Sequence, residues 1–115
     1  MQPHETNKYL FDIAEAADLI VQFTVGKTFA DYHNNPLLWS GVERQFEIIG
    51  EALNQAIQHN PSLATSISNS SRIIAFHNRL IHRYATVADE VVWGFLETYL
   101  PLLAHEVKQL LEQDR

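Results

Sequence analysis

Apolar residues recur every three or four positions along almost the whole of this sequence. The clearest stripe lies in residues 36–58, where apolar side chains fall at Leu38, Val42, Phe46, Ile49, Leu53 and Ala56. This spacing gives an α-helix one apolar face, whereas a half-buried strand would need strict alternation. No stretch of useful length alternates in that way. The sequence therefore predicts an all-α protein, an up-and-down bundle of four or five helices joined by short loops.

Several helix ends carry recognisable capping residues. We expect the first helix to begin at Thr6 as its N-cap and to stop at Gly26. Asn35, followed by proline, is typical of a helix start. Thr86 and Asp89 have the spacing of a capping pair for a later helix.

The connections between these helices can also be placed. Residues 27–35 are expected to form a short helical turn or a loop held by two aromatic side chains. Pro61 ends the helix of residues 36–58, and the serine-rich segment 62–71 has room for one helical turn. Pro101 must kink or break the last apolar stripe, because proline cannot donate the backbone hydrogen bond of a helix interior.

Gly50 lies in the interior of the helix expected over residues 36–58, where a glycine costs roughly 1 kcal/mol relative to alanine. A close crossing by another helix would explain this glycine. Two interpretations remain open for the column formed by Glu43, Glu47 and Glu51. The column is a solvated face, which we favour for Glu43, or Glu51 turns toward the interior or a dimer interface.

Length and composition limit the function classes. A chain of 115 residues with 46% apolar and 19% charged residues is expected to form a single domain over residues 1–115. No cysteine is present, the N-terminus lacks the pattern of a signal peptide, and no apolar run could span a membrane, so we expect a cytoplasmic protein. A net charge of −6 argues against a protein that binds nucleic acid over its whole surface.

The segment 72–84 is the exception to this acidic character. It holds three arginines, two histidines, an asparagine and a tyrosine, and no Asp or Glu occurs between Glu51 and Asp89. A helix that buries one face and exposes arginine, asparagine and histidine elsewhere can bind a phosphate group. We expect no metal site at His77 and His82, because they lack i, i+4 spacing and no carboxylate is near in sequence.

Helical geometry limits how these side chains can cooperate. His77 and His82 are five residues apart, which puts them roughly 140° apart around a straight helix. Asn78 and His82 share a face, with Arg79 adjacent. A pair formed by His77 and His82 would therefore assemble more easily across a dimer interface, with one histidine from each subunit.

A homodimer is also suggested by the number of apolar side chains. Trp39, Trp93, Phe95 and Tyr99, together with the apolar flanks of the helix of residues 72–84, exceed what one narrow core requires. A homodimer through helix faces would bury them. The alternative is that a five-helix core uses all of them, and we favour the dimer.

The sequence His77-Asn78-Arg79-Leu80-Ile81-His82-Arg83-Tyr84 resembles the motif of the HepT-like toxins in the HEPN superfamily. In that family Arg, four residues, His, one residue and Tyr close a helix. The likeness extends to residues 46–53 and 89–93, so it spans most of the chain. The resemblance implies a small dimeric helical bundle whose motif helices face each other, and RNA cleavage without a metal or other cofactor. It also implies a minimal nucleotidyltransferase antitoxin that silences the toxin by adenylylating Tyr84.

One position departs from the family pattern, because the family's phosphate-binding arginine falls at His77. A histidine with the usual pKa of ~6.5 is mostly neutral near pH ~7, so it can replace a guanidinium only when protonated. Three alternatives follow. Arg72, Arg79 or Arg83 supplies the charge; or His77 and His82 act as acid and base when a ribose 2′-hydroxyl attacks its neighbouring phosphate; or the protein is an inactive relative that still binds its nucleotidyltransferase.

Our hypothesis is therefore the toxin component of a toxin–antitoxin pair, an endonuclease with RNA as its substrate. His82 would transfer the proton and Asn78 would position the phosphate. The remaining side chains would stabilise the developing charge: His77, Arg72, Arg79 and Arg83. The alternative, from a different class, is a catalytically inactive bundle that binds a nucleotidyltransferase partner.

Overall fold

A computed structural model describes residues 4–82 and 87–113 of the protein. Within these ranges the chain forms seven helices and no strand, which confirms the predicted all-α class. In chain order they are α1 (His4–Thr24), α2 (Phe29–His33), α3 (Pro36–His59), α4 (Leu63–Ser66), α5 (Ser70–Ile81), α6 (Asp89–Thr98) and α7 (Leu100–Gln113).

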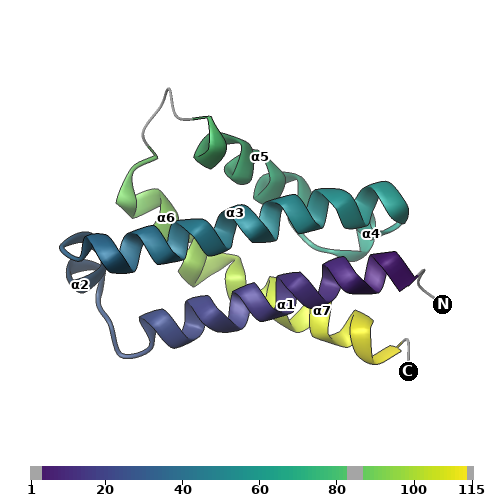
Figure 1. Ribbon diagram of the computed structural model, residues 1–115, viewed down its shortest axis with the longest axis horizontal. Coiled ribbons are helices and arrows are strands. Elements are labelled where there is room, and N and C mark those ends of the chain that lie inside the picture. Colours follow the sequence, from purple (N-terminus) through teal and green to yellow (C-terminus); the bar gives the residue numbers. More distant parts are fainter. Residues whose placement is uncertain (1–3, 83–86, 114–115) are drawn as a thin grey trace.

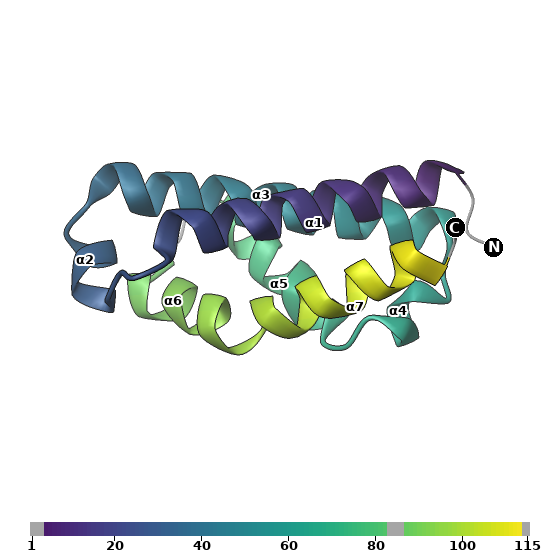
Figure 2. The same ribbon diagram turned by 90° about the horizontal axis from the view of Figure 1, so that it is seen from below.

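The helices lie in two layers. The long helices α1 and α3 run antiparallel and form one layer, and α5, α6 and α7 form the other (Figures 1 and 2). Helix α5 packs on α3, and α7 packs on α1. The short helices α2 and α4 lie at opposite ends of the bundle (Figure 1). This arrangement is the expected up-and-down bundle, with the last helical stripe divided into α6 and α7.

The core lies between the two layers and follows the predicted apolar stripes. Five members of the α3 stripe are buried: Val42, Phe46, Ile49, Leu53 and Ala56. Aromatic rings from three helices fill the space beside α5. The ring of Phe76 stacks on Phe95 with centroids 4.0 Å apart and meets Phe46 edge-on at 5.3 Å. Two residues before Phe95, Trp93 of α6 packs against Phe29 and Tyr32 of α2.

Most predicted helix ends are confirmed. Helix α1 is followed by Gly26 with a φ of +74°, a left-handed conformation that glycine adopts without strain. The side chain of Asn35 accepts a hydrogen bond from the backbone N–H of Leu38 at the start of α3. The connection after α3 contains one short helix, α4, as predicted. The predicted interruption near Pro101 is also confirmed, because Tyr99 separates α6 from α7.

Two predicted caps are wrong. Helix α1 begins before Thr6, and Thr6 is fully buried on the same face as Leu10 and Ile13, so it extends the apolar stripe and caps nothing. Helix α6 begins at Asp89 with Ala88 as its N-cap and no capping side chain. The other half of that predicted pair, residue 86, lies outside the described residues.

Helix α2 carries a capping box that the sequence reading did not identify. Its N-cap Thr28 accepts from the backbone N–H of Asp31, and the Asp31 carboxylate accepts from the N–H of Thr28. These hydrogen bonds lower the pKa of Asp31 below its ordinary value. A separate finding concerns membranes: none of the described helices combines the length and apolar content needed to cross one.

Candidate functional site

The candidate site is built on α5, which carries most of the basic segment. The helix starts after Asn69, whose φ of +62° is left-handed, and the buried Ser70 donates a hydrogen bond to the carbonyl of Ala64 at 3.0 Å. It ends at Ile81, and His82 follows with an extended backbone. The motif helix is therefore shorter than the predicted helix through residue 84. Arg83 and Tyr84 lie outside the described residues.

His77 faces the interior of the bundle, where α5 crosses α3. Its side chain is almost fully buried, and a Cβ added to Gly50 would overlap the Cβ and ring of His77. The close crossing predicted at Gly50 is thus confirmed, and α5 is the crossing helix. The Nδ1 atom of His77 is buried without a hydrogen-bond partner among the described residues, and Nε2 lies 3.8 Å from Oε2 of Glu51.

The glutamate column of α3 has a different environment at each end. The side chain of Glu51 is 60% exposed, so the interpretation that turned it inward is wrong. Glu43 is only partly exposed, and burial is the main cause that raises its pKa, with contributions from Asp89 and Glu47. The nearby Tyr32 is fully buried. Its pKa is raised by burial and then by Glu43 and Asp89.

The other predicted site residues on α5 lie away from this crossing. Asn78, Arg79 and Arg72 are exposed, as is His82 at the end of the helix. The backbone N–H of His82 donates to the carbonyl of Asn78 at 3.1 Å, which fixes the last turn. Asn78, Arg79 and His82 are thus exposed at the C-terminal end of α5, whereas His77 is buried against α3.

Two of the predicted arginines share a pocket with α6. Arg72 and Arg79 line a cavity of about 190 Å³ between α5 and α6. Nη1 of Arg72 donates a hydrogen bond to the hydroxyl of Tyr99 at 2.9 Å. The sequence did not predict Tyr99 as a site residue. It directly follows α6, ten residues after Asp89. Only its aromatic character beside a basic segment could have indicated it.

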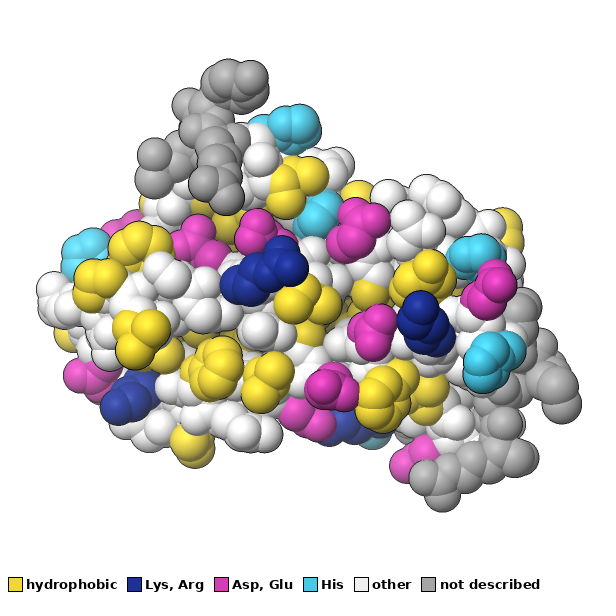
Figure 3. Space-filling model, viewed as in Figure 1, with side chains coloured by type: hydrophobic (Ala, Val, Ile, Leu, Met, Phe, Trp, Pro, Cys, Tyr) yellow, Lys and Arg dark blue, Asp and Glu magenta, His cyan; other side chains and the backbone are white. Residues whose placement is uncertain are grey.

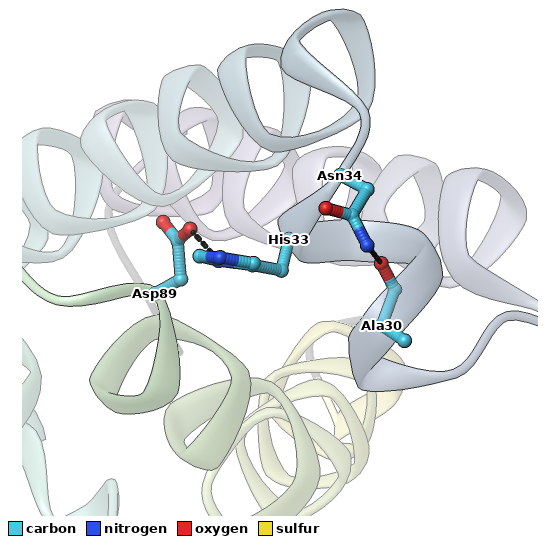
Figure 4. A network of polar contacts seen from close by, with 4 residues as sticks. All are labelled: Ala30, His33, Asn34 and Asp89. Carbon is cyan, nitrogen blue, oxygen red and sulfur yellow. Dashed lines mark hydrogen bonds and ion pairs between the residues drawn. The ribbon is translucent and has the colours of Figure 1, made fainter.

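A hydrogen bond between side chains joins α2 to the start of α6. Nδ1 of His33 on α2 lies 2.7 Å from Oδ2 of Asp89, the first residue of α6 (Figure 4). Beside it, Asn34 donates from its side chain to the carbonyl of Ala30 at 2.9 Å. The contact spans 56 positions in sequence. It ties α6 to α2 three residues after the segment that contains Tyr84.

The described residues contain no cluster of metal ligands. No group of three or more His, Asp or Glu side chains within residues 4–82 and 87–113 is placed to hold an ion. In the same part of the chain, neither Arg72 nor Arg79 forms an ion pair with a carboxylate. The exposed side of α5 therefore carries unneutralised positive charge in a protein whose net charge is −6.

Comparisons with known proteins confirm the resemblance to the HepT-like family. A family model described as ribonuclease HepT-like matches residues 13–110. A protein of Thermococcus cleftensis named "Probable ribonuclease HepT" is 32% identical over 102 residues, which cover 89% of this chain and 92% of that protein. A candidate RNase of Methanocaldococcus jannaschii is 26% identical over 110 residues, covering 94% and 98%. A candidate RNase of Caldanaerobacter subterraneus is 25% identical over 107 residues, covering 93% and 95%. No solved structure gives a significant match. The chain belongs to the HepT-like ribonuclease family.

Proposed function

We propose that this protein is an RNA endonuclease that acts without a metal ion and forms the toxin component of a toxin–antitoxin pair. The observation that carries the proposal is the exposed end of α5, where His82 follows Asn78 and Arg79 in a HepT-like ribonuclease family member. A histidine, a hydrogen-bonding amide and a guanidinium are groups that can transfer a proton, orient a phosphate and stabilise its charge.

In this reaction the ribose 2′-hydroxyl attacks the neighbouring phosphorus atom. His82 accepts the 2′ proton as the O–P bond forms, and the bond to the 5′-oxygen of the next nucleotide breaks. The leaving oxygen takes a proton from a second acid or from water, so the products carry a 2′,3′-cyclic phosphate and a 5′-hydroxyl. Asn78 positions the phosphate that is cut. The positive charge of Arg83, with that of Arg72 and Arg79 at longer range, stabilises the extra negative charge.

His77 lies apart from the exposed residues that the proposed reaction uses. Its ring lies against α3 and is almost fully buried, whereas His82 is exposed. This burial argues against the predicted acid–base pair of a His77 and a His82 from two subunits, because α3 of its own chain covers the His77 ring. The part of His77 in the reaction would then be indirect, through the packing that positions α5.

Silencing by a minimal nucleotidyltransferase antitoxin completes the proposal. The partner would transfer an adenylyl group from ATP to the hydroxyl of Tyr84, forming a phosphodiester and releasing pyrophosphate. Co-expression of the two proteins followed by mass spectrometry should show the mass of one or more adenylyl groups on the peptide that contains Tyr84. An unmodified peptide in a stable complex would contradict the modification.

The ribonuclease activity itself is tested with two matched oligonucleotides. One is RNA, and the other has the same sequence with 2′-deoxyribose throughout. We expect cleavage of the RNA alone, unchanged by EDTA, with 2′,3′-cyclic phosphate ends. Cleavage of both strands, or loss of activity with EDTA, would contradict the proposed chemistry.

One observation favours the second candidate function, a catalytically inactive bundle that binds a nucleotidyltransferase. The family's arginine position is occupied by His77, whose ring is almost fully buried. The variant His77→Arg separates the two functions. Under the inactive-bundle function the wild type cuts no RNA and the arginine variant gains activity. Under the ribonuclease function the wild type is already active.

A further inference from the structure

The pocket between α5 and α6 has a composition suited to one kind of ligand. Its volume is about 190 Å³, and its walls combine two arginines with aromatic rings and no carboxylate: Arg72, Ala75, Phe76, Arg79, Phe95 and Tyr99. Pockets for whole small molecules usually measure ~300–1,000 Å³, so this cavity is of a size to take one chemical group of a larger ligand.

The charge of the pocket selects an anion. The guanidinium of Arg72 is held at 2.9 Å by the hydroxyl of Tyr99, which uses one N–H and leaves the others free. Arg79 is exposed on the same side of α5, seven residues or about two helical turns further on. Neither side chain is paired with a carboxylate in the described part of the chain. Guanidinium groups in this situation match the geometry of phosphate oxygens.

The aromatic walls and the position of the pocket indicate which phosphate compound it binds. Tyr99 and Phe95 are partly exposed, and the bases of unpaired nucleic acid strands pack on aromatic side chains of this kind. Arg79 also precedes His82 by only three residues, about one turn of α5. A strand held in the pocket would therefore continue directly to the proposed catalytic end of the helix.

We propose that this pocket binds a backbone phosphate of unpaired RNA, next to the phosphate that is cut at His82. Arg72 and Arg79 hold the phosphate, and Tyr99 is a positioning residue that orients Arg72. The choice of RNA as the ligand rests on the proposed ribonuclease function. The evidence for the pocket itself is the contact between α5 and the residues of α6 and Tyr99, which does not depend on the proposed function.

The test measures binding of a short single-stranded RNA with 2′-O-methyl groups, which cannot be cut by its own 2′-hydroxyl. We compare Arg72→Gln/Arg79→Gln with the control Lys8→Gln/Arg44→Gln, which removes the same charge from exposed positions on α1 and α3. The pocket variant should bind at least about tenfold more weakly. The slope of log affinity against log salt should fall by about 0.7, the value for one phosphate contact on a single strand.

Tyr99→Phe gives a second measurement that does not depend on net charge. It keeps the aromatic ring and removes the acceptor for Arg72, so affinity should fall several-fold while the salt slope stays as in the wild type. Equal loss in the pocket variant and the control variant would overturn the pocket, and so would unchanged binding by the pocket variant. Thermal unfolding of each variant checks that the fold is kept.

The two proposals fail in different ways. A wild type that cuts RNA, with a pocket variant that binds the methylated strand equally well, overturns the pocket and leaves the ribonuclease. A wild type that binds through the pocket but cuts nothing overturns the ribonuclease and leaves the pocket. Inorganic phosphate and AMP serve as competitors. If either binds the pocket while the wild type does not bind RNA, the assignment to an RNA backbone is wrong.

Discussion

The contact between Gly50 and His77 fixes how deeply α5 lies in the bundle. Because Gly50 has no side chain, the backbone of α3 can approach the Cβ of His77 far more closely than any other residue would permit. This places His77, which falls at the family's arginine according to the resemblance in sequence, inside the helix crossing. The exposed side of α5 is left to Asn78, Arg79 and Arg72.

This contact leads to a prediction about stability. Gly50→Ala should destabilise the fold by about 1–3 kcal/mol, because overpacking at the crossing outweighs the gain of ~1 kcal/mol in helix propensity. Gly94→Ala is the matched control, since a Cβ there meets open space in α6. It should stabilise the protein by up to about 1 kcal/mol. Urea denaturation measures both, and a similar effect of the two substitutions would contradict the close crossing.

The carboxyl of Glu43 predicts a dependence of stability on pH. Its native pKa is raised, mainly by burial, so between the ordinary and the raised value the native state binds more protons than the unfolded chain. The free energy of unfolding therefore falls as pH rises through that interval. Glu43→Gln removes this fall in the free energy of unfolding, so the melting temperature at pH ~7 should rise by a few degrees. At pH ~3 the glutamate is protonated in both states, so the substitution should give no gain there.

The control for this prediction is Glu97→Gln, which removes the same charge from an exposed position on α6. It should give no comparable gain near neutral pH. A rise in melting temperature that is equal for both variants, or one that persists at pH ~3, would show that burial of Glu43 is not the cause.

Residue-level prediction from sequence succeeded where the reason was local. Gly50 could be identified because a glycine in a helix interior needs a packing explanation. The burial of His77 could not be predicted from sequence, because it depends on which face of α5 packs against α3. The pair formed by His33 and Asp89 was missed for the same reason, since its partners are 56 positions apart and no periodicity connects them.

At the level of elements, the helices follow from apolar spacing and from side chains that satisfy their first backbone groups. Asn35 is the clearest example, because its side chain accepts from the N–H of Leu38 and a proline follows it. Asn35→Ala should cost about 1 kcal/mol of stability. Asn34→Ala is the control, since the exposed Asn34 side chain donates to the carbonyl of Ala30 at the end of α2 and caps no helix start. Equal effects on the melting temperature would contradict the cap.

Element boundaries were predicted less well at the ends of α1, α5 and α6. Thr6 was predicted to be an N-cap but is buried in the core, because its position in the apolar stripe of α1 outweighed the capping preference of threonine. Helix α5 ends at Ile81, so His82 lies at the helix end and not within it. A family motif that is expected to close a helix does not specify where the last hydrogen-bonded turn falls.

At the scale of the whole molecule, the aromatic residues that suggested a homodimer are only partly buried. Trp39, Trp93 and Phe95 pack against the core, and Tyr99 lies partly exposed beside α5. The most exposed apolar side chains are different ones, and several of them lie on α1, directly after it, or at the start of α3: Phe11, Val21, Phe23, Val25 and Leu37. Figure 3 shows hydrophobic side chains spread over the face that these two helices form.

The homodimer remains a prediction with a direct test. Light scattering during gel filtration should give about twice the chain mass of 13.2 kDa. The relevant dimer places two α5 helices near each other, so a cysteine at exposed Asn78 should cross-link to its copy in the partner subunit. A mass of one chain at micromolar concentration would contradict the dimer, and with it any catalytic pair of His77 and His82 drawn from two subunits.

The central claim is that His82 at the end of α5 transfers the proton during RNA cleavage. It is tested most directly by the initial rate of RNA cleavage for the wild type and for His82→Ala, purified identically and compared at equal concentration. The account predicts a rate about 10²–10⁴ times lower for the variant, the usual contribution of general acid–base catalysis. Equal rates for the two proteins would contradict it.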